Sequence, residues 1–132
     1  KSCTNILEDN NSRLRKNKKL FCNIKKDDLS VAVSRSHFDK KTDNFIKKHK
    51  FKNIIKIGSS LKIIKICENK VDLYARFGNT MEWDICAAHA ILKASGGRII
   101  TKEKQEMMYG KKNYKNQEFY ALGNLKNIKK YI

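Results

Sequence analysis

Long apolar runs, paired cysteines and proline are what this sequence lacks. No apolar stretch approaches the roughly 18 residues that span a bilayer, so we expect no transmembrane segment. The N-terminus has no apolar core behind its positive charge, and we expect no signal peptide. Four cysteines occur, but none forms a C-x-x-C pair or lies at a zinc-finger spacing from a histidine. These absences favour a cytoplasmic protein with reduced thiols and no structural zinc.

Acidic residues and arginine are also scarce beside lysine. Lysine and arginine total 30 against 13 acidic residues, which gives a formal net charge of +17. Such a charge is typical of proteins that bind nucleic acids or anionic membranes. Only five of the 30 are arginine, however, and the 25 lysines accompany 15 isoleucines and 13 asparagines, all encoded by AT-rich codons. Because arginine is preferred for bidentate base contacts, we expect a compositional origin for much of the charge and no specific nucleic-acid partner.

The pattern along the chain predicts one domain of alternating strands and helices. The 132 residues suffice for a single domain. Residues 1–28 have little periodicity, apart from short apolar pieces that could be edge strands or loop anchors. We expect strands at 29–34, 53–57, 71–77, 98–100 and 118–122, and helices at 39–50, 59–68 and 82–95. This alternation with short connections predicts an α/β layered sheet with flanking helices over residues 29–132.

The start of the helix expected over 59–68 has two readings. Gly58 and Ser59 directly follow a strand, and exposed backbone N–H groups there, with the Lys62 ammonium nearby, would suit a phosphate. Alternatively, Ser59 only caps the helix. The apolar residues recur one turn apart, which predicts a buried face of Leu61, Ile64 and Cys67.

Trp83 and Asp84 stand at the start of the apolar helix expected over 82–95. An aspartate here accepts hydrogen bonds from free backbone N–H groups whether or not it takes part in chemistry. Small residues, Ala87, Ala88 and Ala90, would let the helix pack closely against the sheet, and Gly96-Gly97 would end it. The Asp84 carboxylate would project from the first turn, where it could also meet a cation-bound phosphate.

Other polar residues follow the ends of two expected strands. Ser34-Arg35-Ser36-His37 comes after the first strand, and Arg76 lies at the end of the third. Ligand sites in open α/β sheets lie at the carboxyl ends of strands. We therefore expect these residues and the Ser59 loop to share one edge of the sheet.

The string from Phe77 to Gly97 resembles the second signature of the inositol monophosphatase superfamily, W-D-x-A-A-G followed by a helix and G-G. Two further stretches narrow the match. V-S-R-S-H at 33–37, and I-G-S-S-L-K at 57–62 with 72–78, are similar to the 3'(2'),5'-bisphosphate nucleotidases of the CysQ type. The resemblance runs from about residue 29 to about residue 122. It implies that 29–132 is the C-terminal α/β domain of a fold whose N-terminal half is α+β.

The resemblance also implies an activity. Members are magnesium-dependent, lithium-sensitive phosphatases that convert adenosine 3',5'-bisphosphate to AMP and phosphate. By this resemblance Asp84 would be the catalytic metal ligand, which binds Mg²⁺ and faces the scissile phosphate. The substrate would be bound by Asp84 together with five further residues, His37, Gly58, Ser59, Lys62 and Arg76.

Two departures from the family pattern limit this expectation. Ala88 replaces the usual glycine, a small change that could crowd the site. More seriously, the family's first metal motif is D-P-x-D-G-T, and a chain without proline cannot contain it. We therefore expect the chain to be inactive alone and a separately encoded N-terminal half to be a possible partner. Three alternatives stay open: a basic module that binds nucleotides or nucleic acid without catalysis, a structural remnant, and a fragment that acts on an inositol phosphate.

Overall fold

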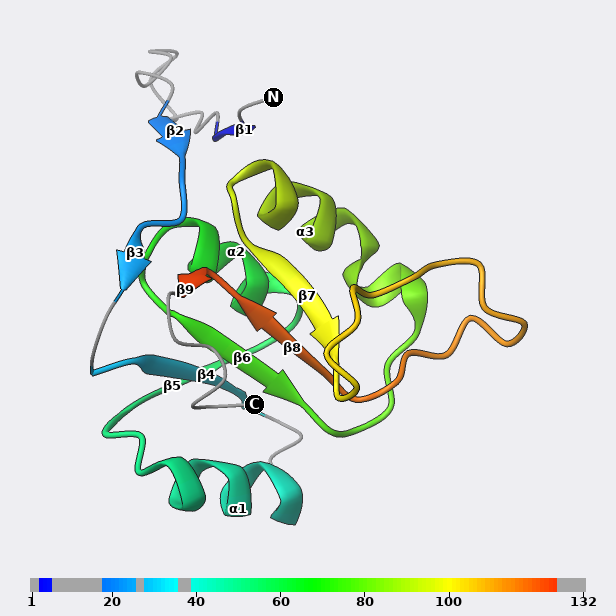
Figure 1. The fold of residues 1–132 in the computed structure, drawn as a ribbon, viewed down its shortest axis with the longest axis horizontal. Helices are drawn as coiled ribbons and strands as arrows, with labels where there is room; N and C mark the ends of the chain where they lie inside the picture. Colours follow the sequence, from blue (N-terminus) through cyan, green and yellow to red (C-terminus); the bar gives the residue numbers. More distant parts are fainter. Residues whose placement is uncertain (1–2, 6–17, 26–27, 36–38, 126–132) are drawn as a thin grey trace.

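The computed structural model of the chain describes residues 3–5, 18–25, 28–35 and 39–125. Its centre is a five-stranded sheet in the order β5-β4-β6-β8-β7, with helices on both faces (Figure 1). The strands are β4 (Ser30–Ser34), β5 (Asn53–Ile57), β6 (Leu73–Arg76), β7 (Arg98–Thr101) and β8 (Phe119–Leu122). The helices are α1 (Lys40–His49), α2 (Leu61–Cys67) and α3 (Glu82–Ala94). The expected α/β layered sheet is confirmed, and its strands and helices begin and end within a few residues of the expected positions.

Three strands, β4, β5 and β6, run in the same direction, so their carboxyl ends lie at the same end of the sheet. β4 pairs in parallel with both β5 and β6, whereas β8 runs antiparallel to β6 and to β7. Parallel neighbours require crossover connections. α1 makes the crossover from β4 to β5, and α2 makes the one from β5 to β6. Consequently the residues that follow β4, β5 and β6 meet on the same side of the sheet.

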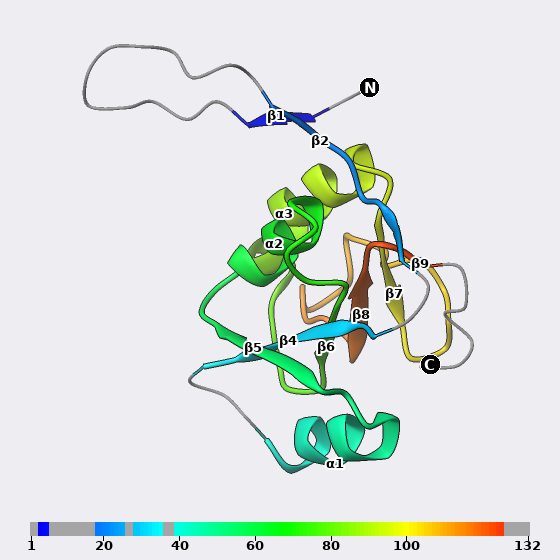
Figure 2. The same cartoon turned by 90° about the vertical axis from the view of Figure 1, so that its left-hand side faces the viewer.

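Two apolar layers hold the helices against the sheet. α1 covers one face, and α2 and α3 cover the other (Figure 2). In β4, Val31 and Val33 pack with Phe45 of α1, whereas Ala32 between them packs with the α2 and α3 side. This division follows from the period of two along a strand. Helices on both faces explain why β4, β6 and β8 read as nearly continuous apolar runs.

The N-terminal residues contribute two small sheets. β1 (Cys3–Asn5) pairs antiparallel with β2 (Lys18–Leu20), and β3 (Ile24–Lys25) pairs in parallel with β9 (Asn124–Leu125). The backbone N–H of Cys22 donates to the Ser95 carbonyl at 2.7 Å, which ties this segment to the end of α3. Of the two readings of the short apolar pieces in residues 1–28, edge strands or loop anchors, short strands are found at residues 3–5 and 18–20. Within the described ranges, none of the helices combines the length and apolarity that crossing a membrane requires.

The buried face of α2 agrees with the expected one only in part. Cys67 is 1% exposed and Ile64 packs partly buried against the core, as expected, but Leu61 is 54% exposed, whereas Ile63 and Ile66 are buried. The helix is apolar on two adjacent faces, so both the 61–64–67 and the 63–66 spacings fit an amphipathic helix. The prediction is wrong for Leu61 because Ile63 and Ile66 face the core, and a sequence does not show where its neighbours pack.

The end of α3 matches the expectation more closely than its middle. Gly96 has a φ of 88°, in the left-handed region that favours glycine after a helix. Of the three alanines expected to approach the sheet, Ala88 is buried, but Ala87 and Ala90 are exposed. The closest approach occurs at Gly97, where an added Cβ would lie 2.4 Å from Leu92 Cδ1 and 2.6 Å from the Leu122 carbonyl oxygen.

Changing Gly97 to Ala is expected to lower the free energy of unfolding by about 1–3 kcal/mol, because the new methyl group overpacks the contact between α3 and β8. The Leu122 carbonyl belongs to the central sheet and cannot move aside as a flexible side chain would. Urea unfolding followed by circular dichroism measures the change. Unaltered stability would contradict the close packing at this position.

Candidate functional site

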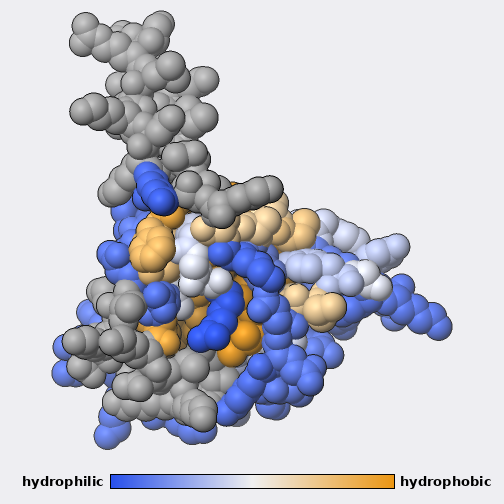
Figure 3. Space-filling model, turned by 45° about the horizontal axis from the view of Figure 1, so that its top comes forward, coloured by the Kyte–Doolittle hydropathy of each residue, from blue (hydrophilic) through white to orange (hydrophobic). Residues whose placement is uncertain are grey.

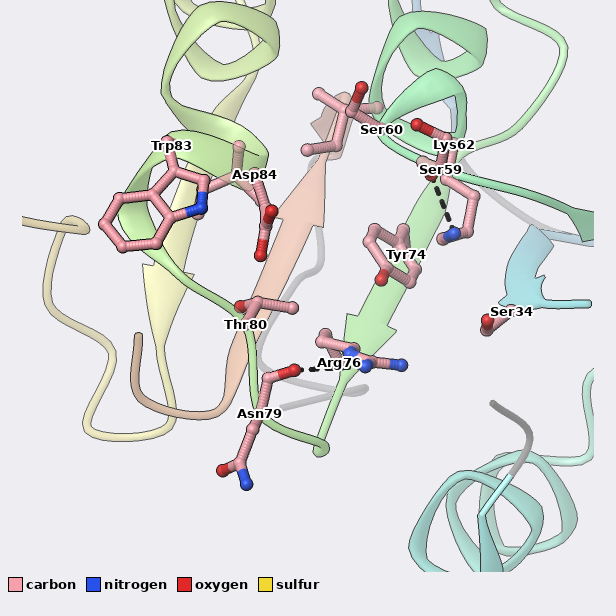
Figure 4. Close-up of a pocket in the computed structure, with 12 residues that line it drawn as sticks. Ser34, Ser59, Ser60, Lys62, Tyr74, Arg76, Asn79, Thr80, Trp83 and Asp84 are labelled. Carbon is pink, nitrogen blue, oxygen red and sulfur yellow. Dashed lines mark hydrogen bonds between the residues drawn. The ribbon is translucent and has the colours of Figure 1, made fainter. Parts of the chain in front are cut away.

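A cavity of about 520 Å³ opens where β4 and β6 end, beside the first turns of α2 and α3 (Figure 4). It is lined by Ser34, Ser59, Ser60, Lys62, Ile63, Tyr74, Arg76, Asn79, Thr80, Trp83, Asp84 and Ile85. Four of the six residues expected to bind the substrate therefore meet here, namely Ser59, Lys62, Arg76 and Asp84. Gly58 is half-buried next to this wall but is not among the lining residues. His37 lies outside the described residues.

Lys62 is the buried cation of the cavity. It is 4% exposed, and its Nζ donates to the carbonyl oxygens of Ser59 at 2.8 Å and Ile57 at 3.2 Å. The ammonium also lies 4.9 Å from the centre of the Tyr74 ring, within the range of a cation–π contact. Burial, and then the nearby Arg76 charge, lower the pKa of Lys62 to about 8. Lys62 thus closes the turn before α2 while keeping a positive charge in the cavity near neutral pH.

That turn is not the serine-capped helix start considered from the sequence. Ser59 has a φ of 56°, in the left-handed region, and α2 begins only at Leu61. Ser60 occupies the cap position, but its side chain makes no capping hydrogen bond. The Lys62 ammonium, rather than a serine hydroxyl, satisfies backbone groups of the turn. Capping by Ser59 is therefore wrong for this helix.

Arg76 supplies the second cation, from the last residue of β6. One guanidinium nitrogen, Nη2, donates to the Asn79 carbonyl at 3.2 Å, which holds the side chain over the loop that follows the strand. Its Nε is buried and has no hydrogen-bond partner among the described residues. An unpaired buried donor is costly, and the positive charge of the guanidinium would attract an anion in the cavity.

Asp84 lies on the side of the cavity opposite Lys62 (Figure 4). Its Oδ2 accepts a hydrogen bond from the Met81 backbone N–H at 2.7 Å, so the carboxylate does cap the first turn of α3. The side chain is nevertheless exposed and lines the cavity. The capping role considered from the sequence is therefore confirmed, and capping through one oxygen is compatible with a ligand role for the carboxylate.

A bound Mg²⁺ would need more oxygen ligands than these residues offer. Mg²⁺ requires octahedral coordination and dehydrates reluctantly, so protein sites usually place several oxygens together. Asp84 carries the only carboxylate among the residues that line the described cavity. In the part of the chain that the structure describes, no three histidine, cysteine, aspartate or glutamate side chains gather in a way that could hold a metal ion. The donor set fits one ligand of such a metal and not a complete site.

Sequence reasoning missed several residues of the cavity wall. Tyr74 is the clearest case: it is buried two positions before Arg76 on β6, and burial raises the pKa of its hydroxyl to about 12. Strand alternation places residues 74 and 76 on the same face, a signal that could have identified it. Asn79 and Thr80 also line the cavity, from the loop after β6, where no periodic pattern indicates a buried or functional position.

Comparison with known proteins adds evidence of descent. The family model "Inositol monophosphatase family" matches residues 5–129. The 3'(2'),5'-bisphosphate nucleotidase CysQ of Buchnera aphidicola is 38% identical over 94 residues, which cover 69% of this chain and 36% of that protein. An uncharacterised Rhizobium leguminosarum protein is 36% identical over 91 residues, which cover 64% of this chain and 96% of that protein.

A solved structure shows the same relation. The chain superposes on CysQ from Bacteroides thetaiotaomicron with a TM-score of 0.72 and 34% identity, over 83% of this chain and 42% of that one. An inositol monophosphatase structure, SaIMPase-II with inositol monophosphate bound, shares the fold with a TM-score of 0.65 at 13% identity. The chain spans less than half the length of the CysQ relatives it matches. With the family model covering nearly all of its residues, the chain belongs to the inositol monophosphatase family.

Proposed function

We propose that this chain forms the substrate-binding part of a phosphatase that converts adenosine 3',5'-bisphosphate to AMP and phosphate. The observation that carries the proposal is the cavity in which two cations, Lys62 and Arg76, face one carboxylate, Asp84. The two cations suit the phosphate that stays on the nucleotide. The carboxylate suits the phosphate that is cleaved, because it can bind a metal cation that assists the cleavage. The identity to two CysQ proteins supports the nucleotide bisphosphate as the substrate class.

The residues predicted to form the site take two roles in this proposal. Arg76 and Lys62 bind the phosphate that stays on the nucleotide, with Ser59 on the same wall and Gly58 behind it. The resemblance also implies a substrate contact for His37, which lies outside the described residues. Asp84 provides one ligand for Mg²⁺ beside the phosphate that leaves. The remaining ligands come from polypeptide outside the described residues, because the cavity offers no second carboxylate.

Exposed apolar residues on α3 and α2 agree with a metal site that a second polypeptide segment completes. On the outer side of α3, Ala87, Ala90 and Ala94 are exposed at helical spacing, and Leu61 of α2 is 54% exposed. Figure 3, in which the top of the view in Figure 1 comes forward, shows apolar side chains at the surface among hydrophilic ones. Contiguous exposed apolar surface marks a contact site more often than a free face. We propose that residues 29–132 form the C-terminal domain and that the polypeptide completing the metal site packs here.

Substitution of Arg76 tests the substrate-binding wall directly. Arg76→Gln removes a charged donor whose Nε has no partner in the described residues, and it should weaken binding of adenosine 3',5'-bisphosphate about tenfold or more. Isothermal titration of the purified chain measures the dissociation constant. Arg98→Gln is the matched control, because Arg98 is exposed on β7 and does not line the cavity. Equal losses in both variants, or no binding at all, would refute the proposed site.

The pH dependence of binding provides a separate prediction. The bisphosphate is fully ionised above about pH 7.5, so its own charge no longer changes. The pKa of Lys62 is lowered to about 8, and its positive charge is lost as the pH rises through this value. Affinity for the bisphosphate should therefore fall severalfold between pH 7.5 and pH 9.5. In Lys62→Met the affinity should be weak at every pH and should change little between pH 7.5 and pH 9.5. If the affinity of this variant fell as steeply as that of the unaltered chain, another group would be responsible for the pH dependence.

A further inference from the structure

Two exposed aromatic side chains stand together at the rim of the cavity. Trp83 lines the cavity and is 63% exposed, and Tyr114 is 55% exposed. Their ring centroids are 6.1 Å apart and the rings are tilted by 46°. Figure 4 shows the Trp83 indole across the cavity from Lys62 and Arg76. The cavity thus has a cationic side and an aromatic side, with Asp84 next to the indole.

The loop that carries Tyr114 is fixed to the start of α3. The Tyr114 carbonyl accepts a hydrogen bond from the Glu82 backbone N–H at 2.8 Å. The Asn116 side chain donates to the Met81 carbonyl at 2.7 Å and to Thr80 Oγ1 at 3.1 Å. These bonds join the loop to the residues directly before Trp83. The position of Tyr114 relative to the indole is therefore set by the backbone and does not depend on ring contact alone.

A buried ion pair adds a second attachment for this loop. The Glu82 carboxylate accepts hydrogen bonds from the Gly110 N–H at 2.9 Å and the Lys111 N–H at 3.0 Å, and it pairs with Lys111 Nζ at 2.6 Å. Glu82 is 7% exposed, so this attachment lies inside the protein while Trp83, the next residue, points outward. Two large aromatic side chains thus lie together at the surface, and more than half of each is exposed to solvent.

The chemistry of such a rim fits a planar base better than a sugar ring. Aromatic side chains held in place stack on nucleobases, because every base presents a flat π-face. An inositol phosphate has no planar apolar surface to cover these rings. We propose that Trp83 and Tyr114 form the stacking surface for the purine base of a nucleotide whose phosphate lies at Lys62 and Arg76. This inference rests on the proposed function.

Trp83 is the only tryptophan in the chain, so its fluorescence reports on this surface alone. The full chain is titrated with adenosine 3',5'-bisphosphate and with ribose 5-phosphate, with excitation at a wavelength that adenine does not absorb. The nucleotide should quench the indole emission, and ribose 5-phosphate should leave it almost unchanged. Calorimetry of Trp83→Ala and Tyr114→Ala should show nucleotide binding about tenfold weaker or worse, with ribose 5-phosphate binding unaffected. Trp83→Phe should retain most of the affinity and thereby exclude a folding defect.

The outcomes separate this inference from the proposed function. Nucleotide binding that depends on Arg76 but leaves the indole emission unchanged, with normal affinity in Trp83→Ala, overturns the stacking surface and leaves the proposed function standing. Equal loss of nucleotide and ribose 5-phosphate binding in the aromatic variants also overturns it, because the residues would then only maintain the cavity. If neither the nucleotide nor ribose 5-phosphate binds, the proposed function is overturned together with the inference.

Discussion

Changing Asp84 to Asn is expected to lower turnover at least about a hundredfold in an enzyme completed around this chain. Such an enzyme is a chimera in which this chain replaces the segment of the Buchnera aphidicola CysQ protein that it matches. Asparagine retains an oxygen that can accept the hydrogen bond from Met81, so α3 keeps its cap. The substitution removes the negative charge with which we propose that Asp84 holds Mg²⁺, and loss of a catalytic metal ligand lowers turnover strongly.

Phosphate release from adenosine 3',5'-bisphosphate measures this effect, and circular dichroism and thermal unfolding check the fold. Asp43→Asn is the matched control, because Asp43 lies on α1, pairs with Lys47 at 2.6 Å and does not line the cavity. The control should keep near-normal turnover. Near-normal turnover in Asp84→Asn would mean that Asp84 acts only as a helix cap.

The chain by itself is expected to release phosphate from adenosine 3',5'-bisphosphate at least about a thousandfold more slowly than the chimera, even with abundant Mg²⁺. A bound metal stabilises the transition state by several kcal/mol, and each 1.36 kcal/mol corresponds to about a tenfold change in rate. Asp84 is the single carboxylate of the described cavity and cannot alone assemble the oxygen ligands that Mg²⁺ needs.

The measurement is phosphate release by the purified chain, with the Asp84→Asn chain as the contamination control. Weak nucleotide binding without turnover would agree with a binding wall that lacks the rest of the site. Magnesium-dependent turnover that disappears in Asp84→Asn would show that this chain holds a complete metal site, contrary to the donor set described above.

The fold could be predicted from the sequence because its signals are local. Val31, Ala32 and Val33 form an uninterrupted β-branched and apolar run, which is typical of a strand buried on both faces. Gly96-Gly97 marked the end of α3 because glycine is favoured at the φ of 88° that Gly96 adopts, and because Gly97 has no Cβ to clash with Leu92. Signals of this kind lie within a few residues of one another, so they can be recognised without knowing which helices and strands pack against them.

The site was less predictable because it depends on distant partners. Lys62 could be placed near the cavity from its position after β5, but its hydrogen bonds to the Ser59 and Ile57 carbonyls depend on a left-handed residue in the turn. Tyr114 is 31 positions from Trp83 in the sequence, and only the backbone pairing of its loop with residues 80–82 brings the rings together. No periodic pattern in a lysine-rich loop indicates such a contact.

The most direct test of the central claim is phosphate release by the chimera from adenosine 3',5'-bisphosphate and from inositol monophosphate, measured with and without Mg²⁺. The chain is proposed to provide the substrate wall of a bisphosphate nucleotidase, so the chimera should hydrolyse the nucleotide in the presence of Mg²⁺ and prefer it to inositol monophosphate. A folded chimera that is inert toward both, or that hydrolyses only inositol monophosphate, would contradict the account.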